Sequence, residues 1–384
     1  MKTYRWIFLV LMAGFFAGCG GDSEEELVGD WQRRALKEGS GVSYAASFVI
    51  GDKGYVACGY SGYRVQVKEV HAYDHIADVW SRMADFPGQG RQQAVGFSLT
   101  TGGKTYGFVG TGWDGDQTTL KDFWRYDPAK DRTNETSEIG PNYQYPDGEH
   151  PWEAIAPLPE SADSRCGAIA FSLEKNGKMF GYVGFGFKDY PSKLYMLDLW
   201  EFDPEGETID NGKILFGRWT KTVNATTKRS HAAVFIIDNK AYVCTGKNAS
   251  ANISDFSVFD GYSWDTRRPM NNVNQDEDFD DDYTALPRSA GVAYVVKVYG
   301  DEKRGHIVGG TSTNWEYDHV SDLWTQVTSF YNNQNGKQNR DGMISFSFQD
   351  GRAFVGLGKR GVEDCDDLWE FIPRIDDYIY DDYQ

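Results

Sequence analysis

Five arginines recur at equivalent places in the sequence and are candidate ligand-binding residues. Each stands six positions before an aromatic residue of a short apolar segment; the pairs are Arg91 and Phe97, Arg165 and Phe171, Arg229 and Phe235, Arg288 and Tyr294, and Arg340 and Phe346. A sixth copy of the pattern has Val42 before Phe48. A guanidinium group can hold a carboxylate or a phosphate in two parallel hydrogen bonds. The arginines are therefore candidate anion-binding residues, and their alternative role is to pair with carboxylates of the protein itself.

Aromatic and amide side chains between these copies have the chemistry of a sugar-binding surface. Tyr60, Trp113 and Tyr190 are the candidate ligand-binding residues, accompanied by Tyr63 and Phe187 and by Asn248, Asn252, Asn332 and Asn333. An aromatic ring can stack on the apolar face of a sugar while neighbouring amides bond to its hydroxyl groups. Exposed loops of secreted proteins often have this composition, so an ordinary surface is the alternative interpretation.

Patterns typical of metal binding or catalysis are weak in this chain. The histidines form no HxH pair, and the cysteines that follow Cys19 form no CxxC. The acidic run 276–282 lacks the glycine and the terminal glutamate of an EF-hand loop. We find no Ser-His-Asp ordering and no phosphate-binding loop. We therefore predict no metal and no cofactor, and we favour a protein without catalytic activity over an enzyme.

One unit of short β-rich segments recurs six times and must position these residues. Its second strand ends in glycine, and the six endings are Val56–Gly59, Val109–Gly112, Val183–Gly186, Val243–Gly246, Ile307–Gly310 and Val355–Gly358. The third strand ends in an aromatic residue, and the fourth carries a tryptophan, namely Trp80, Trp152, Trp219, Trp264 or Trp324. Repetition at such a period predicts one closed array. We expect an all-β fold, a six-bladed β-propeller of four-stranded antiparallel blades.

The last copy supplies a test of this architecture. It ends at Phe371 with no tryptophan after it, whereas Trp31 stands before the first copy begins. We predict that the segment around Trp31 adds the outer strand of blade six, so that the N-terminal strand closes the ring. Equivalent positions in a propeller are related by rotation about one axis, so the five guanidinium groups are expected to face the mouth of a central channel. Cys58 and Cys244 then lie on opposite blades as small buried residues.

The repeated features resemble the Kelch repeat over roughly residues 28–375, nearly the whole mature chain. They are the Arg opening the first strand, the glycine ending the second, the aromatic–Asp turn and the Trp. Only Gly309-Gly310 keeps the glycine pair of that repeat, so the chain resembles a divergent member of the galactose-oxidase-like Kelch superfamily. In some Kelch proteins the same ring of arginines contacts acidic peptides, and elsewhere an Arg at this position makes structural pairs. The copper-binding residues of the Kelch oxidases have no match here.

The N-terminus has the form of an export signal. Lys2 and Arg5 precede the apolar run 6–16, and Ala17-Gly18 stand directly before Cys19. This order resembles a bacterial lipoprotein signal, which implies removal of residues 1–18 and lipidation of Cys19. Residues 19–27 are then a flexible acidic tether, and residues 376–384 form an acidic tail. The acidic run after Cys19 resembles a surface-export signal, so we expect an outer-membrane lipoprotein exposed at the cell surface, with the periplasmic face as the alternative.

The net charge of the chain limits the classes of molecule that it could bind. Residues 1–18 hold two of the 39 basic residues and none of the 57 acidic ones, so the mature chain is strongly acidic. Nucleic acid is therefore excluded as a partner, because its phosphates need a basic surface. We predict a non-catalytic binding module for an anionic or glycan ligand, or for a partner protein, at the arginine-ringed mouth. The alternatives are a carbohydrate-active enzyme such as a sialic acid epimerase, and a structural subunit of an outer-membrane complex.

Overall fold

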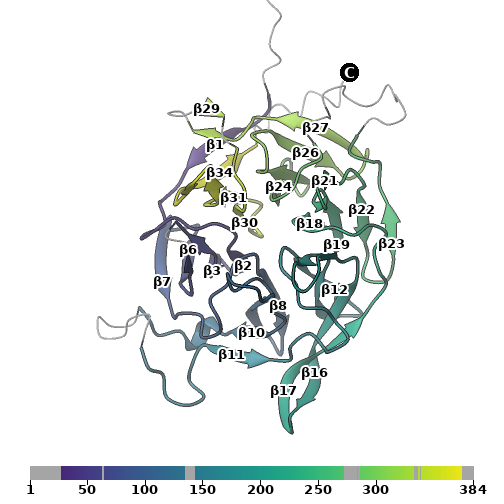
Figure 1. The fold of residues 1–384 in the computed structure, drawn as a ribbon. Coiled ribbons are helices and arrows are strands. Elements are labelled where there is room, and N and C mark those ends of the chain that lie inside the picture. Colours follow the sequence, from purple (N-terminus) through teal and green to yellow (C-terminus); the bar gives the residue numbers. More distant parts are fainter. Residues whose placement is uncertain are drawn as a thin grey trace, which may run out of the picture.

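The computed structural model describes residues 27–62, 65–134, 143–271, 283, 286–332, 336–337 and 339–373. Six four-stranded antiparallel sheets surround one axis (Figure 1), which confirms the predicted all-β, six-bladed propeller. One short 3₁₀ helix, Pro128–Lys130, interrupts the strands of the described part. No helix among the described residues is long and apolar enough to span a membrane.

Each blade runs from an inner strand at the axis to an outer strand at the rim. Blade one contains β2 (Ala46–Ile50), β3 (Lys53–Ala57), β6 (Val70–Asp74) and β7 (Val79–Met83), and blade two contains β8 (Val95–Thr101), β9 (Lys104–Gly110), β10 (Phe123–Tyr126) and β11 (Trp152–Ile155). Blade three contains β12 (Ile169–Lys175), β13 (Lys178–Gly184), β16 (Leu199–Asp210) and β17 (Lys213–Lys221), and blade four contains β18 (Ala233–Ile237), β19 (Lys240–Cys244), β22 (Ser257–Phe259) and β23 (Trp264–Thr266). Blade five contains β24 (Val292–Lys297), β25 (Lys303–Val308), β26 (Asn314–Asp318) and β27 (Leu323–Val327).

Blade six is completed by the N-terminal strand, as predicted. Its strands are β30 (Ile344–Ser347), β31 (Ala353–Gly356), β34 (Leu368–Ile372) and β1 (Asp30–Arg33), with Trp31 opposite Phe371 in an antiparallel register. The two rings lie 5.1 Å apart, and the Trp31 indole donates a hydrogen bond of 3.0 Å to the carbonyl oxygen of Thr328 in the preceding blade. The first and last blades are thereby joined, and the ring has no open sheet edge at the seam.

Neighbouring blades pack through aromatic rings and glycines. In blades one to five an aromatic residue of the inner strand stacks on a ring of the second strand; Phe48 and Tyr55, for example, lie 5.1 Å apart. The next blade places a glycine against several of these rings, and a Cβ added to Gly107 would lie 2.1 Å from Phe48. The glycine is needed because only a residue without a side chain allows this approach.

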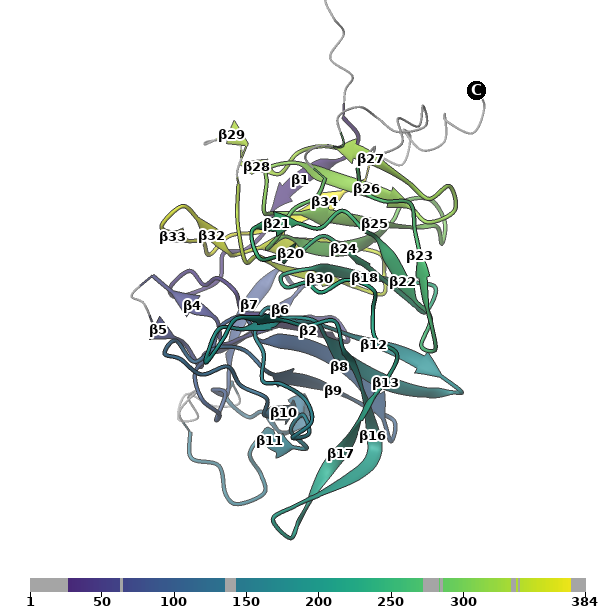
Figure 2. The same ribbon diagram turned by 45° about the vertical axis from the view of Figure 1, so that its right-hand side comes forward.

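The two faces of the disc differ in their loops. We call the face on which the second strands end the upper face. It carries the small hairpins β4–β5 (Tyr60–Ser61 and Val65–Gln66), β14–β15 (Phe187–Lys188 and Leu194–Tyr195), β20–β21 (Lys247–Asn248 and Ala251–Asn252) and β32–β33 (Lys359–Arg360 and Glu363–Asp364). The turn between β16 and β17 leaves by the opposite face, and this hairpin extends well beyond the other sheets (Figures 1 and 2).

Candidate functional site

The five arginines lie inside the blades. Their exposed fractions are 2 % or less, and each guanidinium group contacts a residue one or two positions before the third strand of its own blade. The partners are Asp122 for Arg91, Asp198 for Arg165, Asp255 for Arg229, Thr313 for Arg288 and Asp367 for Arg340. Arg91 and Arg165 hold both oxygens of the carboxylate, with nitrogen–oxygen distances of 2.7 to 2.9 Å.

A second contact makes each arginine a clamp. One guanidinium nitrogen also donates to the carbonyl oxygen of the residue that precedes the final glycine of the second strand, as in Arg91 to Thr111 at 3.0 Å and Arg165 to Phe185 at 3.1 Å. The equivalent bonds in the other three blades reach Thr245, Gly309 and Leu357. We call each set an arginine clamp. The expectation that the guanidinium groups face the channel mouth is not met, and the geometry supports the alternative of structural pairing.

Electrostatics in the clamps favour the ionised carboxylates. Burial opposes ionisation of Asp122, Asp198 and Asp367, but hydrogen bonds and charge from the paired arginine outweigh burial and hold the pKa of each carboxyl below its usual value. In blade five, where Thr313 replaces the aspartate, burial lowers the pKa of Arg288 to about 10. The clamp charges are therefore balanced within the protein in the blades that have Asp.

The depressed carboxyl pKa values predict acid sensitivity. A group whose pKa is lowered on folding stabilises the native state above its unfolded pKa, about 4, and this stability is lost as the pH falls through the folded pKa. We expect the urea midpoint of unfolding to stay nearly constant from pH 7 to about pH 5 and to fall steeply below about pH 4. The Asp198→Asn variant should be less stable at pH 7 but show a shallower acid slope. A midpoint unchanged down to about pH 3 would contradict this assignment.

The sequence contained a signal for these partners that our pattern search missed. Three of the aspartates stand two residues before a tryptophan, in Asp122-Phe123-Trp124, Asp198-Leu199-Trp200 and Asp367-Leu368-Trp369. Each indole donates to the same carboxylate that the arginine holds, at 2.6 to 2.9 Å. The repeated Asp-x-Trp spacing could therefore have identified the anionic half of three of the clamps, but not Asp255 in blade four, which has Ser257 in place of the tryptophan.

A closed ring of backbone hydrogen bonds encircles the axis near the upper face. It joins the residues two positions after each arginine, or after Val42 in blade one: Tyr44, Gln93, Gly167, His231, Ala290 and Gly342. Each N–H donates to the carbonyl oxygen of the preceding member at 2.8 to 3.2 Å, and all six have φ between 52° and 60°. The side chains of Tyr44 and His231 lie over Gly342 and Gly167, where a Cβ would come within 2.8 Å of their rings. The ring narrows the channel at this end.

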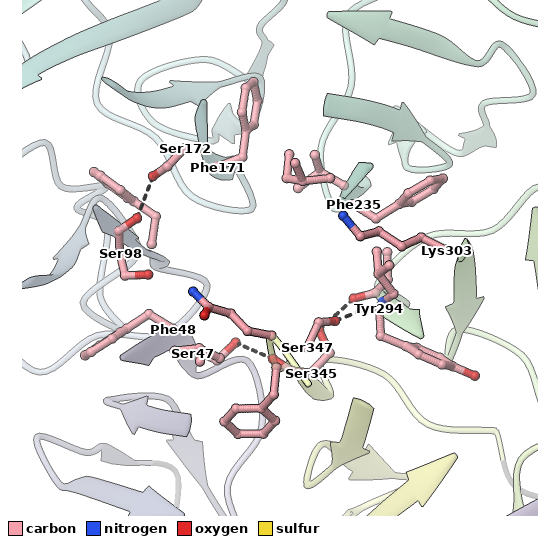
Figure 3. Close-up of a pocket in the computed structure, with 18 of the residues that line it drawn as sticks. Ser47, Phe48, Ser98, Phe171, Ser172, Phe235, Tyr294, Lys303, Ser345 and Ser347 are labelled. Atoms are coloured by element: carbon pink, nitrogen blue, oxygen red, sulfur yellow. Dashed lines mark hydrogen bonds between the residues drawn. The ribbon is translucent and has the colours of Figure 1, made fainter. Parts of the chain in front are cut away.

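A large cavity occupies the part of the channel on the other side of that ring (Figure 3). It has a volume of about 760 Å³ and is lined by inner strands of all six blades. Serines face it, and Ser172 and Ser345 donate to carbonyl oxygens of adjacent blades at 2.7 and 2.8 Å. The Lys303 ammonium points into the cavity, while the rings of Phe48 and Phe171 point away from it into the blades. None of the five clamp arginines lines this cavity.

A second cavity, of about 360 Å³, opens on the upper face between blades two and three. We call it the aromatic cleft; it is lined by Gln93, Trp113, Asp116, Gln117, Thr119, Cys166, Phe187, Asp189 and Tyr190. Bridges to Gln92 and Thr119 hold the backbone of Trp113 in place, and its indole donates to the Asp116 carbonyl oxygen at 2.9 Å. Tyr190 is 64 % exposed, so its ring is available to a ligand.

At the inner end of the aromatic cleft, His231 contacts and positions the side chains of Gln93 and Phe187. One ring nitrogen lies 3.0 Å from the side-chain oxygen of Gln93, and the ring of Phe187 packs against the imidazole at 5.6 Å. Burial, and next the charge of Lys247, lower the pKa of His231 to about 4. The imidazole is therefore neutral at pH 7 and can donate to Gln93, which leaves the Gln93 amide hydrogens free to bond to a ligand.

The sequence-predicted residues thus fall into separate places. Trp113 and Tyr190 meet in the aromatic cleft, whereas Tyr60 lies elsewhere on the upper face, with the Lys359 ammonium 5.0 Å from its ring centre. Cys58 and Cys244 are buried and unbridged, as predicted, and Cys166 and Cys365 are likewise free and buried. Cys19, Tyr63, Asn333, the acidic run 276–282 and the tail 376–384 lie outside the described residues.

No metal centre emerges from the described residues, in which no three His, Cys, Asp or Glu side chains gather closely enough to hold an ion. His71 and His75 are four residues apart, but His75 stacks on Phe348 and bonds to Asp52 and Asp350, away from His71.

This chain matches no known protein-family model and no curated protein sequence.

Proposed function

We propose that this chain is a divergent Kelch-type propeller that is lipidated at Cys19, faces outward from the outer membrane, and binds a neutral glycan in the aromatic cleft. The proposal rests on one observation. Trp113, Phe187 and Tyr190 line a single cavity together with amide, hydroxyl and carboxylate groups. Aromatic faces stack on the apolar side of a sugar ring, and the polar groups can accept and donate hydrogen bonds to its hydroxyls.

Charge favours a neutral ligand over an anionic one. Two acidic residues, Asp116 and Asp189, line the aromatic cleft, and its described lining contains no Lys or Arg. Lys193 lies nearby, 5.5 Å from the Phe187 ring centre, but pairs with Asp189 at 3.2 Å. The five clamp arginines that could have attracted a carboxylate are buried among their own partners. An anionic ligand would therefore meet net repulsion in this cleft.

A carbohydrate-active enzyme is the second candidate. Asp341 follows Arg340 beside the backbone ring, and burial raises the pKa of its carboxyl despite the opposing charge of Lys247. Burial, followed by the charge of Asp341, raises the pKa of Tyr44 to about 12. A carboxyl and a phenol with raised pKa values at one mouth are the kind of groups that acid–base catalysis uses. Turnover of a bound sugar that is lost in Asp341→Asn would favour this candidate.

The binding proposal predicts that stacking residues control affinity. We expect the mature protein to bind at least one neutral hexasaccharide from a panel of cellohexaose, maltohexaose, mannohexaose and xylohexaose, measured by titration calorimetry. Trp113→Ala and Tyr190→Ala should each weaken that binding about five- to tenfold, since loss of one stacked ring costs about 1–1.5 kcal/mol. Tyr299→Ala is the matched control, because Tyr299 is also an exposed tyrosine, at 59 %, but does not line the cleft.

An anionic hexasaccharide added to this panel separates the two ligand classes. Hexagalacturonate has the size of the neutral sugars but carries carboxylates, so it should bind more weakly than they do. Preferred binding of hexagalacturonate, or equal binding by wild-type protein and Trp113→Ala, would show that the aromatic cleft is not a neutral glycan site.

A further inference from the structure

Blade one lacks the arginine clamp and contains a cavity in its place. Backbone hydrogen bonds show the equivalence: Gly358 donates to the Val42 carbonyl as Gly59 donates to that of Arg91, and Cys58 donates to Glu69 as Thr111 donates to Asp122. Val42, Glu69 and His71 therefore occupy the places that Arg91, Asp122 and Trp124 hold in blade two. When one copy of a repeat lacks a residue that the other copies share, the difference can mark a functional site.

The cavity has an apolar wall and a polar end. Its volume is about 180 Å³, and four valines and a buried cysteine form the wall: Val42, Val56, Val65, Val67 and Cys58. Lys37, Ser61 and His71, all buried, add polar groups. Ser40 and Glu69 also line the cavity and are exposed, so they mark the side on which it opens to solvent. We call this space the blade-one cavity.

Lys37 is a buried cation to which no carboxylate of the described residues is bonded. Its exposed fraction is 3 %, and its backbone N–H is held by the Asp366 carbonyl oxygen at 2.9 Å. In the described residues its ammonium makes one hydrogen bond, to the Glu38 carbonyl oxygen at 3.0 Å, and no ion pair. An ammonium has three hydrogens to donate, and a buried charge that is not paired is costly. The side chain thus keeps donors available to a ligand.

His71 provides the second buried polar group. It is 6 % exposed, and its imidazole has no hydrogen-bond partner among the residues that the structure describes. Burial, followed by the charges of Lys37 and Arg82, lowers the pKa of His71 to about 3. Burial likewise lowers the pKa of Lys37, although the charges of Glu69 and Asp366 oppose this shift. A neutral imidazole at pH 7 offers one further N–H donor.

From this arrangement we infer that the blade-one cavity binds a short aliphatic monocarboxylate of two to four carbons. The carboxylate would accept hydrogen bonds from Lys37 and His71, while the alkyl chain would lie against the valines. It would place a buried anion in blade one, as the clamp aspartates do in blades two, three, four and six, because Glu69 at the equivalent position is exposed. Since one water occupies about 30 Å³, the cavity has room for roughly six heavy atoms, the number in butyrate. This site is separate from the aromatic cleft, and the inference does not depend on glycan binding.

The test uses acetate, propionate and butyrate with the folded mature protein. We expect saturation-transfer NMR at pH 7 to detect binding of at least propionate and butyrate, and we expect Lys37→Met to weaken it at least tenfold. Affinity should also fall as the pH is raised through the lowered pKa of Lys37, because the neutral amine no longer attracts the carboxylate. His71→Phe, which removes the imidazole N–H and fills part of the cavity, is the second variant should Lys37→Met fold poorly.

Matched probes and a matched variant make the result decisive. Butan-1-ol has a similar shape but no charge, and butylammonium has the opposite charge, so neither should bind comparably. Lys359→Met removes an ammonium from the same face that does not line the cavity, and it should leave butyrate binding unchanged. No binding of any of the three carboxylates at 50 mM, equal binding of butan-1-ol, or unchanged affinity in folded Lys37→Met and His71→Phe would each overturn the inference.

Discussion

Replacing Asp367 with alanine is expected to lower the free energy of unfolding by about 3–5 kcal/mol, the usual cost of removing one partner of a buried ion pair. Asp367 is the most buried of the clamp carboxylates, with a side chain 9 % exposed against 1 % for Arg340. The change would leave the Arg340 charge buried without its carboxylate and would also remove the acceptor of the Trp369 indole, which lies at 2.9 Å. Urea unfolding followed by tryptophan fluorescence measures the loss.

Two further variants test whether the loss of stability comes from the Arg340–Asp367 ion pair itself. Asp301→Ala removes a carboxylate that is 99 % exposed and 3.5 Å from Lys297, and it should leave the midpoint unchanged. The double variant Arg340→Met/Asp367→Leu removes both charges, so it should recover part of the stability lost in Asp367→Ala. If Asp367→Ala unfolds at the same urea concentration as the wild type, the clamp does not stabilise blade six.

The second large effect is expected at the seam of the ring. Trp31→Ala should destabilise the protein by about 2–4 kcal/mol, somewhat less than a fully buried Trp→Ala change because Trp31 is half-buried. The variant loses ring contacts with Tyr294, Phe330 and Phe371 and the hydrogen bond to Thr328. Hydrogen exchange should accelerate in β1 and β34 before it does so in blades two to four, since the seam is opened locally.

Ile209→Ala is the control for the seam. Ile209 lies near the end of the β16–β17 hairpin, is 76 % exposed, and pairs across the strands with Ile214. Its loss should change neither the global midpoint nor exchange in β34. Uniform acceleration over all six blades in Trp31→Ala would instead indicate that the ring opens only as a whole.

The two cavities proposed as binding sites both arise where the sixfold pattern is broken. The aromatic cleft depends on loops that differ from blade to blade, with Trp113 in blade two and Phe187 and Tyr190 in blade three. The blade-one cavity depends on Val42, a smaller residue than the arginine of the other five blades. In contrast, the clamps and the backbone ring follow the symmetry: each clamp connects strands within its own blade, and the backbone ring links all six blades. The regular positions stabilise the disc, and the irregular ones give it distinct surfaces.

Much of the architecture was predictable because it follows from periodic local patterns. The glycine-ended second strands, the aromatic–Asp turns and the tryptophans recur in order, and the missing tryptophan after Phe371 pointed to Trp31. The direction of the arginines was not predictable in the same way. Rotational symmetry makes their positions equivalent, but whether a side chain points to the axis or into the blade depends on its partner. Arg91 and Asp122 are 31 residues apart, and the third strand brings them together.

The sequence alone determined the number of blades, the closing strand and the set of candidate residues, since each of these follows from the spacing of residue types along the chain. Tertiary structure alone decided which candidates share a site. Trp113 and Tyr190 meet because adjacent blades place their upper loops side by side, while Tyr60 lies apart from them. It also decided that Lys37, from the connection between β1 and β2, enters the space left by Val42. Such contacts join segments that no local pattern relates, so folding is what brings them into contact.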